Sequence, residues 1–313
     1  MSELPSSGDL APYPATAARI PDTPSSAKSQ ITDDYLITAG AAAGLSGAFG
    51  APLSGIVFAL EKLHTSFSTF VILAAAAGAF VADFLASAVF GLQPVLSFVD
   101  LGFLLLRQYA WLIPIGVVAG LTGAAMTRGY LWMSRVAGAI AMYWRIVAAS
   151  FVALGVGLWA PSLVGGGENL IELAENAVAG LVPLIALLAG KMLFSMTSFA
   201  SGVPGGIFMP VLAAGALSGA VCGSLLVSAG WAARDDAAVF AVAAMAATLT
   251  ATVKSPLTSI VLTVEMVGTV THVLPMALCA FVALGMGDLV RSPAIYSALL
   301  RRRLAAEGVT GAK

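Results

Sequence analysis

The stretch SGVPGGIFMP, residues 201–210, decides both the fold and the candidate site of this chain. Pro204 and the paired glycines end one apolar segment, and the run after Pro210 begins another. Residues 206–208 are therefore expected at the N-terminus of a helix. The first N–H groups of a helix lack intrahelical partners, and its dipole places about half a positive charge there. The stretch predicts an anion site without a charged base, with a plain Gly-Pro loop as the alternative.

The overall composition is that of an integral membrane protein. Of 313 residues, 59% are apolar and 10% are charged, and the mean hydropathy is +0.95. Soluble domains carry about 25% charged residues. The net charge of -1 argues against a nucleic-acid partner, which would require a basic face. Cys222 and Cys279 lie in apolar runs, so we expect neither a disulfide framework nor a metal site.

Apolar runs separated by short polar breaks fill the chain from Leu36 onward. A membrane-spanning helix needs about 20 apolar residues. Uneven runs interrupted by Gly and Pro predict an all-α, polytopic membrane fold of tilted and broken helices, as in transporters built from repeats. The runs are 67–90, 109–127, 146–164, 177–196, 239–252 and 274–289, with Gly- or Pro-broken segments at 39–49, 51–63, 207–229 and 256–266.

Two segments, 51–61 and 255–265, look like copies of one design. Both read small-Pro-Leu-small-small-Ile-Val, and both end in a glutamate nine residues after the proline, Glu61 and Glu265. Chance similarity of two apolar stretches is the alternative. The shared spacing favours an internal repeat, which is the usual build of secondary transporters.

Charge placement predicts the orientation in the membrane. The loop between residues 127 and 146 carries arginines but no acidic residue, so we expect it on the cytoplasmic side. Arg301–Arg303 place the C-terminus on that side as well. Residues 1–34 are rich in Ser and Pro and are expected to be a disordered tail.

Four motifs in order resemble the CLC family of chloride channels and proton/chloride exchangers. GGIFMP at 205–210 is similar to the family's G-x-I-F-x-P signature, and 39–67 resembles its G-A-A-A-G-L and A-P-L-x-G helix pair. Residues 255–266 are similar to the later A-P-L-T segment that ends in Glu, and PAIYS at 293–297 resembles the P-x-x-Y motif. The resemblance implies an inverted-repeat fold that transports chloride as its substrate, without a cofactor.

The resemblance also assigns roles to residues. The N–H groups of Ile207 and Phe208, which follow Gly206, would coordinate chloride, and the hydroxyl of Tyr296 would donate to the same ion. The alternative for Tyr296 alone is an interfacial tyrosine. Both motifs favour chloride-like anions over fluoride.

A homodimer in a lipid membrane is a further implication. In the family, the helices that correspond to 51–63, 67–90, 256–266 and 274–289 form the dimer interface, and this sequence contains all four. We expect a multi-pass protein of the cell membrane.

Missing motifs separate this chain from its family. The family's G-S-G-I-P and G-R-E-G-P loops do not occur, and residues 1–34 stand in their place. The chain is therefore expected to lack the N-terminal half of the fold. Its membrane domain would cover 35–303, with the end of the first repeat at 35–100, the second repeat at 105–300 and a tail at 304–313. A truncated, non-conducting fragment or a membrane scaffold subunit is the alternative to a transporter.

Lys62 is the second departure. It occupies the position at which the exchangers carry an internal proton-accepting glutamate, and an ammonium cannot relay protons as a carboxylate does. Transport without proton coupling is the prediction, and an ordinary basic residue on the cytoplasmic side is the alternative reading of Lys62. Glu61 and Glu265 are candidates for an ion or proton path, and Glu265 could equally be structural. An enzyme is not expected, because neither H-E-x-x-H nor G-x-S-x-G occurs.

Overall fold

The computed structural model describes residues 24–63, 68–91, 96, 101–102, 104–176, 180–203 and 205–306. All regular elements in these ranges are helices, so the all-α fold class is confirmed. The chain divides into two compact units, an N-terminal unit up to Leu92 and a C-terminal unit from Gln93 to Gly308.

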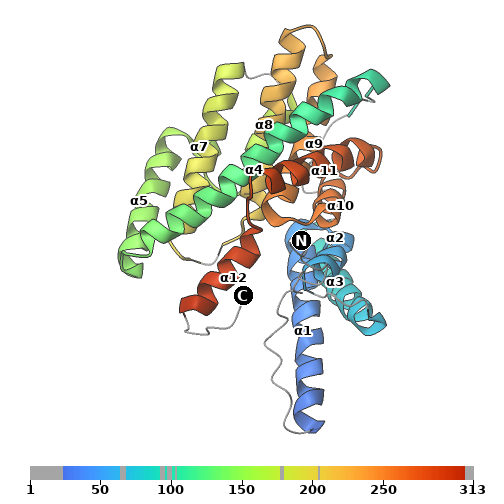
Figure 1. The fold of residues 1–313 in the computed structure, drawn as a ribbon, viewed down its shortest axis with the longest axis vertical. Helices are drawn as coiled ribbons and strands as arrows, with labels where there is room; N and C mark the ends of the chain where they lie inside the picture. The colour runs from blue at the N-terminus through green and yellow to red at the C-terminus, as the bar shows by residue number, and fades with distance from the viewer. Residues whose placement is uncertain are drawn as a thin grey trace, which may run out of the picture. The chain divides into compact units, whose positions relative to one another are not determined.

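The N-terminal unit contains α1 (Pro24–Phe49), α2 (Pro52–Phe58), the π-helical turn η1 (Ala59–Leu63) and α3 (Thr69–Phe90) (Figure 1). Small residues let these helices approach closely. A Cβ added to Gly78 of α3 would lie 2.4 Å from the carbonyl oxygen of Ala39 in α1. A Cβ on Gly55 of α2 would lie 2.5 Å from that of Ala42.

Helix α1 begins at Pro24, whereas the sequence predicted a tail that extends to residue 34. Proline is well suited to the first turn of a helix, because its missing N–H is not needed there. The helix therefore extends N-terminally beyond the apolar run that suggested it. Residues 1–23 lie outside the described part of the chain, so their disorder stays a prediction.

The C-terminal unit is organised around α9 (Arg234–Val253), onto which α4, α8, α10 and α11 pack (Figure 1). The most apolar part of α9 is completely buried, because other helices of the protein surround it on all sides. The other helices are α4 (Tyr109–Ala137), α5 (Met142–Trp159), α6 (Glu168–Asn176), α7 (Leu181–Ala200), α8 (Phe208–Ser228), α10 (Pro256–Val267), α11 (Val273–Leu289) and α12 (Ile295–Ala306), with 3-10 turns at Leu106–Gln108 and Pro161–Leu163.

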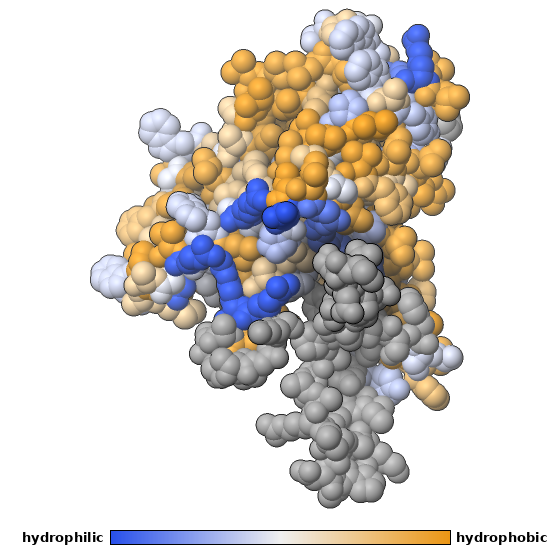
Figure 2. Space-filling view, viewed as in Figure 1, coloured by the Kyte–Doolittle hydropathy of each residue, from blue (hydrophilic) through white to orange (hydrophobic). Residues whose placement is uncertain are grey.

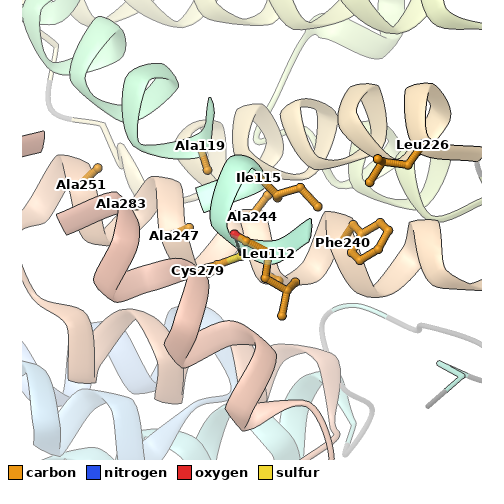
Figure 3. Packing of buried hydrophobic residues seen from close by; sticks show 11 residues of the cluster. Leu112, Ile115, Ala119, Leu226, Phe240, Ala244, Ala247, Ala251, Cys279 and Ala283 are labelled. Atoms are coloured by element: carbon orange, nitrogen blue, oxygen red, sulfur yellow. Dashed lines mark hydrogen bonds between the residues drawn. The ribbon is translucent and has the colours of Figure 1, made fainter. Parts of the chain in front are cut away.

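Glycine and alanine bring the neighbours of α9 close to its backbone. A Cβ added to Gly219 of α8 would lie 2.5 Å from the carbonyl oxygen of Phe240, and one on Gly123 of α4 would lie 2.6 Å from that of Thr248. Figure 3 shows how Phe240 and the alanines of α9 pack with α4 and α11. Within this cluster the thiol of Cys279 donates to the carbonyl oxygen of Leu112 over 3.1 Å, so this cysteine is a small core residue.

Within the described ranges, six helices are long and apolar enough to cross a membrane. They are 69–90, 106–137, 142–159, 181–200, 208–228 and 234–253. Large apolar side chains lie exposed on several of them, including Phe84 at 72% and Trp159 at 91%. The face seen in Figure 2 is largely hydrophobic, with hydrophilic residues gathered over α12. The prediction of an integral membrane protein is confirmed.

The two segments that resemble each other in sequence also share a backbone geometry. Ala51, before α2, has φ −134° and ψ 72°, and Ser255, before α10, has φ −135° and ψ 84°. A proline follows each of them in the first turn of the helix. The residues before them, Gly50 and Lys254, are both left-handed, with φ of 57° and 61°. Helix α3 packs on α1 and α2, and α11 packs on α9 and α10, so the similarity extends over three helices.

Candidate anion-binding site

The chain leaves α7 through a turn built by Ser201 and Gly202. The Ser201 hydroxyl donates to the carbonyl oxygen of Ser198 over 2.7 Å and accepts from the N–H of Val203 over 3.3 Å. Gly202 has φ of +79°, a conformation that other residues rarely adopt. Pro204 lies outside the described residues. Together these contacts end α7 and direct the chain toward α8.

Helix α8 begins at Phe208, with Ile207 at the N-cap position, which is the helix start that the sequence predicts. No side chain caps this end, and the first turn closes with the bond from the N–H of Val211 to the carbonyl oxygen of Ile207 at 3.2 Å. Pro210 has no N–H, so the donors of the helix start are confined to Ile207, Phe208 and Met209. The positive end of the helix dipole lies at the same place.

Gly206 precedes this helix start in an exposed position. A Cβ added to Gly206 would meet no atom within 4 Å, so the space beside it is open. Ile207 and Phe208 are buried, with 6% and 7% of their surfaces exposed. The residue before the helix start therefore borders open space, while the side chains of Ile207 and Phe208 anchor the start of α8 in the protein.

Tyr296, the second residue of α12, lies beside Phe208. The centroids of the two rings are 6.3 Å apart, and the ring planes are inclined by 37°. Burial raises the pKa of the Tyr296 phenol above its usual value of about 10, so the hydroxyl keeps its proton and can donate a hydrogen bond. The structure thus brings together residues of two motifs that are far apart in the sequence.

Comparison with known proteins identifies the family. A family model described as voltage gated chloride channel matches residues 11–288 of this chain. The chain belongs to the voltage-gated chloride channel family, the CLC family. This confirms the resemblance that the four sequence motifs indicate.

Solved CLC structures have the same fold. A slow cyanobacterial Cl⁻/H⁺ antiporter is 28% identical with a TM-score of 0.81, and the match covers 87% of this chain and 65% of that one. A CLC-type fluoride/proton antiporter is 21% identical with a TM-score of 0.68, covering 84% and 64%. A eukaryotic CLC transporter is 18% identical with a TM-score of 0.69, covering 89% and 49%. This CLC chain therefore spans less than two thirds of the length of these structures.

The ionisable candidates of this CLC chain lie in different units. Glu61 and Lys62 are half-buried in the π-helical turn η1 of the N-terminal unit. Glu265 is half-buried near the end of α10, in the same unit as Phe208 and Tyr296. Among the residues that the structure describes, no group of three or more His, Cys, Asp or Glu side chains could hold a metal ion.

Two basic residues near the site did not emerge from sequence reasoning. Lys191 of α7 is fully buried, and it was detectable as the single charged residue of the predicted 177–196 segment. Arg145 of α5 extends toward the turn before α8, because its Nη1 lies 3.4 Å from where a Cβ on Gly202 would be. The sequence carried no sign of this second contact, since it joins segments that are far apart in the chain.

Proposed function

We propose that this CLC chain carries chloride or a chloride-like anion across a membrane, and that it is a transport protein and not an enzyme. The observation that supports the proposal is the meeting of the N-terminus of α8 with Tyr296 of α12. Backbone donors and a neutral hydroxyl hold an anion without a full opposite charge. Such a site binds strongly enough for entry and weakly enough for release.

Anion flux into liposomes that contain only this chain tests the proposal. Tyr296→Phe keeps the ring against Phe208 and removes the donor, so we expect flux to fall about tenfold or more, the worth of one hydrogen bond to a charged group. Tyr143→Phe is the matched control, because Tyr143 is 70% exposed on α5, and it should leave flux unchanged.

Absence of flux from the wild-type chain would contradict transport by this polypeptide alone. It would favour the alternative of a non-conducting CLC fragment or a membrane scaffold subunit. Equal flux in the wild type and Tyr296→Phe would retain transport and remove Tyr296 from the site.

We propose further that transport is not coupled to protons, because Lys62 stands where the exchangers carry a glutamate. Two of the similar solved structures are a Cl⁻/H⁺ antiporter and a fluoride/proton antiporter. Proton coupling in this chain therefore has to be measured directly. Proton movement is measured during chloride-driven flux with a pH-sensitive dye. We expect no stoichiometric counterflow in the wild type, and a counterflow of fixed ratio would refute the proposal.

A homodimer in the cell membrane, with its C-terminus in the cytoplasm, completes the proposal. Its interface would use α2 with η1, α3, α10 and α11. Exposed apolar residues such as Phe84 on α3 and Phe281 on α11, at 72% and 55%, suit either lipid or a second subunit. Single-molecule photobleaching in bilayers should give two steps per particle, whereas a single step would exclude the dimer. A C-terminal reporter that is active only outside the cytoplasm should stay silent.

A further inference from the structure

Lys191 carries a positive charge inside a helix that is apolar enough to cross the membrane. The residue is 0% exposed. Its ammonium donates to the carbonyl oxygens of Leu163 and Gly165, over 3.0 and 2.7 Å, and lies 5.8 Å from the centroid of the Phe194 ring. No carboxylate among the described residues pairs with it. A buried charge in a membrane segment is costly, and where it persists it usually serves the path of an ion.

The ammonium lies against the helix whose N-terminus forms the candidate site. A Cβ added to Gly167 would be 3.2 Å from Nζ of Lys191 and 2.7 Å from Cβ of Ala213 in α8. A Cβ added to Gly166 would be 3.2 Å from Cβ of Met209. Met209 and Ala213 are one turn apart on the same face of α8. The glycine-rich segment is therefore packed between Lys191 and the first two turns of α8.

We propose that Lys191 is a positioning residue that supplies the fixed positive charge of the anion site. Its hydrogen bonds hold the segment 163–167 against α8, and its charge raises the affinity of the site for an anion. The inference rests on the proposed transport function. An ammonium without a carboxylate and an anion at the start of α8 stabilise each other, because electrostatic attraction is only weakly screened in a buried environment.

This attraction is reciprocal. A bound anion that is stabilised by Lys191 must in turn stabilise the folded protein that contains the charged lysine. Chloride should therefore raise the midpoint of thermal unfolding of the wild-type protein. Neutralising the charge at residue 191 should reduce this protection as well as the affinity.

The decisive variant is Lys191→Gln, because a glutamine amide can donate to both carbonyl oxygens but has no charge. Chloride binding is measured by isothermal titration calorimetry of the full chain in detergent. We expect the dissociation constant to rise about tenfold in Lys191→Gln and to stay within about twofold of wild type in Lys191→Arg, as expected for one charge in a partly screened interior. Lys254→Gln is the matched control, since Lys254 is already paired with Asp288 at 2.6 Å, and its affinity should not change.

A second variant keeps the lysine and cancels its charge. Ser195 lies one turn after Lys191 and donates to the carbonyl oxygen of Lys191 over 2.7 Å. Ser195→Asp places a carboxylate on the same face of α7, so it should weaken chloride binding about as much as Lys191→Gln.

The outcomes separate this inference from the proposed function. Wild-type affinity in a folded Lys191→Gln or Ser195→Asp protein would overturn the role of Lys191 while leaving transport intact. Equal loss of affinity in Lys191→Arg and Lys191→Gln would overturn it too, since it would show that shape and not charge matters. Absence of chloride binding to the wild type would instead refute the anion site itself.

Discussion

The helix groups α1–α2–α3 and α9–α10–α11 follow one backbone design but lie in different surroundings. Each enters its second helix through a left-handed residue, a residue with φ near −135° and a proline. The two third helices, which correspond to each other, show the difference: three residues of α3 are buried, whereas six residues of the shorter α11 are buried. The backbone geometry is thus kept where the turn requires it, while the side chains differ where the neighbouring helices differ.

Two pairs of equivalent positions show this division. Gly50 corresponds to Lys254, and both have positive φ, although only glycine adopts this conformation without strain. Gly55 corresponds to Ser259, because each is the fifth residue of its segment, which starts at Ala51 or Ser255. Exchanging residues between the copies therefore tests which differences are tolerated.

The largest effect is expected for Gly55→Ser, which copies Ser259 into the first group. The new Cβ would lie 2.5 Å from the carbonyl oxygen of Ala42, so α2 must move away from α1. We expect a loss of about 2–3 kcal/mol in the free energy of unfolding, typical of overpacking. Thermal unfolding in detergent measures it, with Gly44→Ser as the control, because a Cβ on Gly44 meets nothing within 4 Å. Equal stability of the two variants would refute the close approach.

Gly50→Lys copies Lys254 into the first group and should have the next largest effect. The φ of 57° at Gly50 is strained for residues with a Cβ, so we expect a loss of about 1–2 kcal/mol. Gly50→Asn should cost less, since asparagine tolerates this conformation better. A lysine variant as stable as the asparagine variant would contradict the explanation.

Ser259→Gly is the reverse of the first exchange and should cost less than it. The Ser259 hydroxyl donates to the carbonyl oxygen of Ser255 over 2.7 Å, and glycine also lowers helix propensity. We expect a loss of about 1 kcal/mol in the free energy of unfolding. Ser259→Ala removes the hydroxyl alone and should lose only part of this. A loss as large as that of Gly55→Ser would show that the two positions are not equivalent.

Lys254→Gly should have the smallest effect. Glycine relieves the strain at φ 61°, but it removes the ion pair with Asp288, so the two contributions nearly cancel to within about 0.5 kcal/mol. A double-mutant cycle with Asp288→Asn measures the ion pair separately. A coupling energy above about 1.5 kcal/mol would show that the pair dominates, against what exposed pairs usually contribute.

Local chemistry predicted the helix start at Ile207 and Phe208, because proline and glycine limit the backbone whatever surrounds them. Helix ends that carry charges were predicted less well. Helix α9 starts at Arg234, earlier than the run from residue 239, because Asp236 accepts from the N–H of Ala233 over 2.7 Å and completes the helix start. A search for apolar runs excludes a charged residue such as Asp236 from a helix, whereas its hydrogen bond at the helix N-terminus stabilises the helix.

The sequence by itself determined that this protein lies in a membrane, that proline-led helices recur within it, and that the stretch 201–210 starts a helix. These properties depend on composition and on residues that are close together in the chain. Only the tertiary structure decided that Tyr296 meets Phe208 and that Lys191 is buried behind α8. Such contacts depend on how helices pack, and close packing depends on small residues whose partners are not visible in a linear pattern. The stretch that starts α8 was readable from the sequence, and the family resemblance pointed to Tyr296, whereas no motif pointed to Lys191.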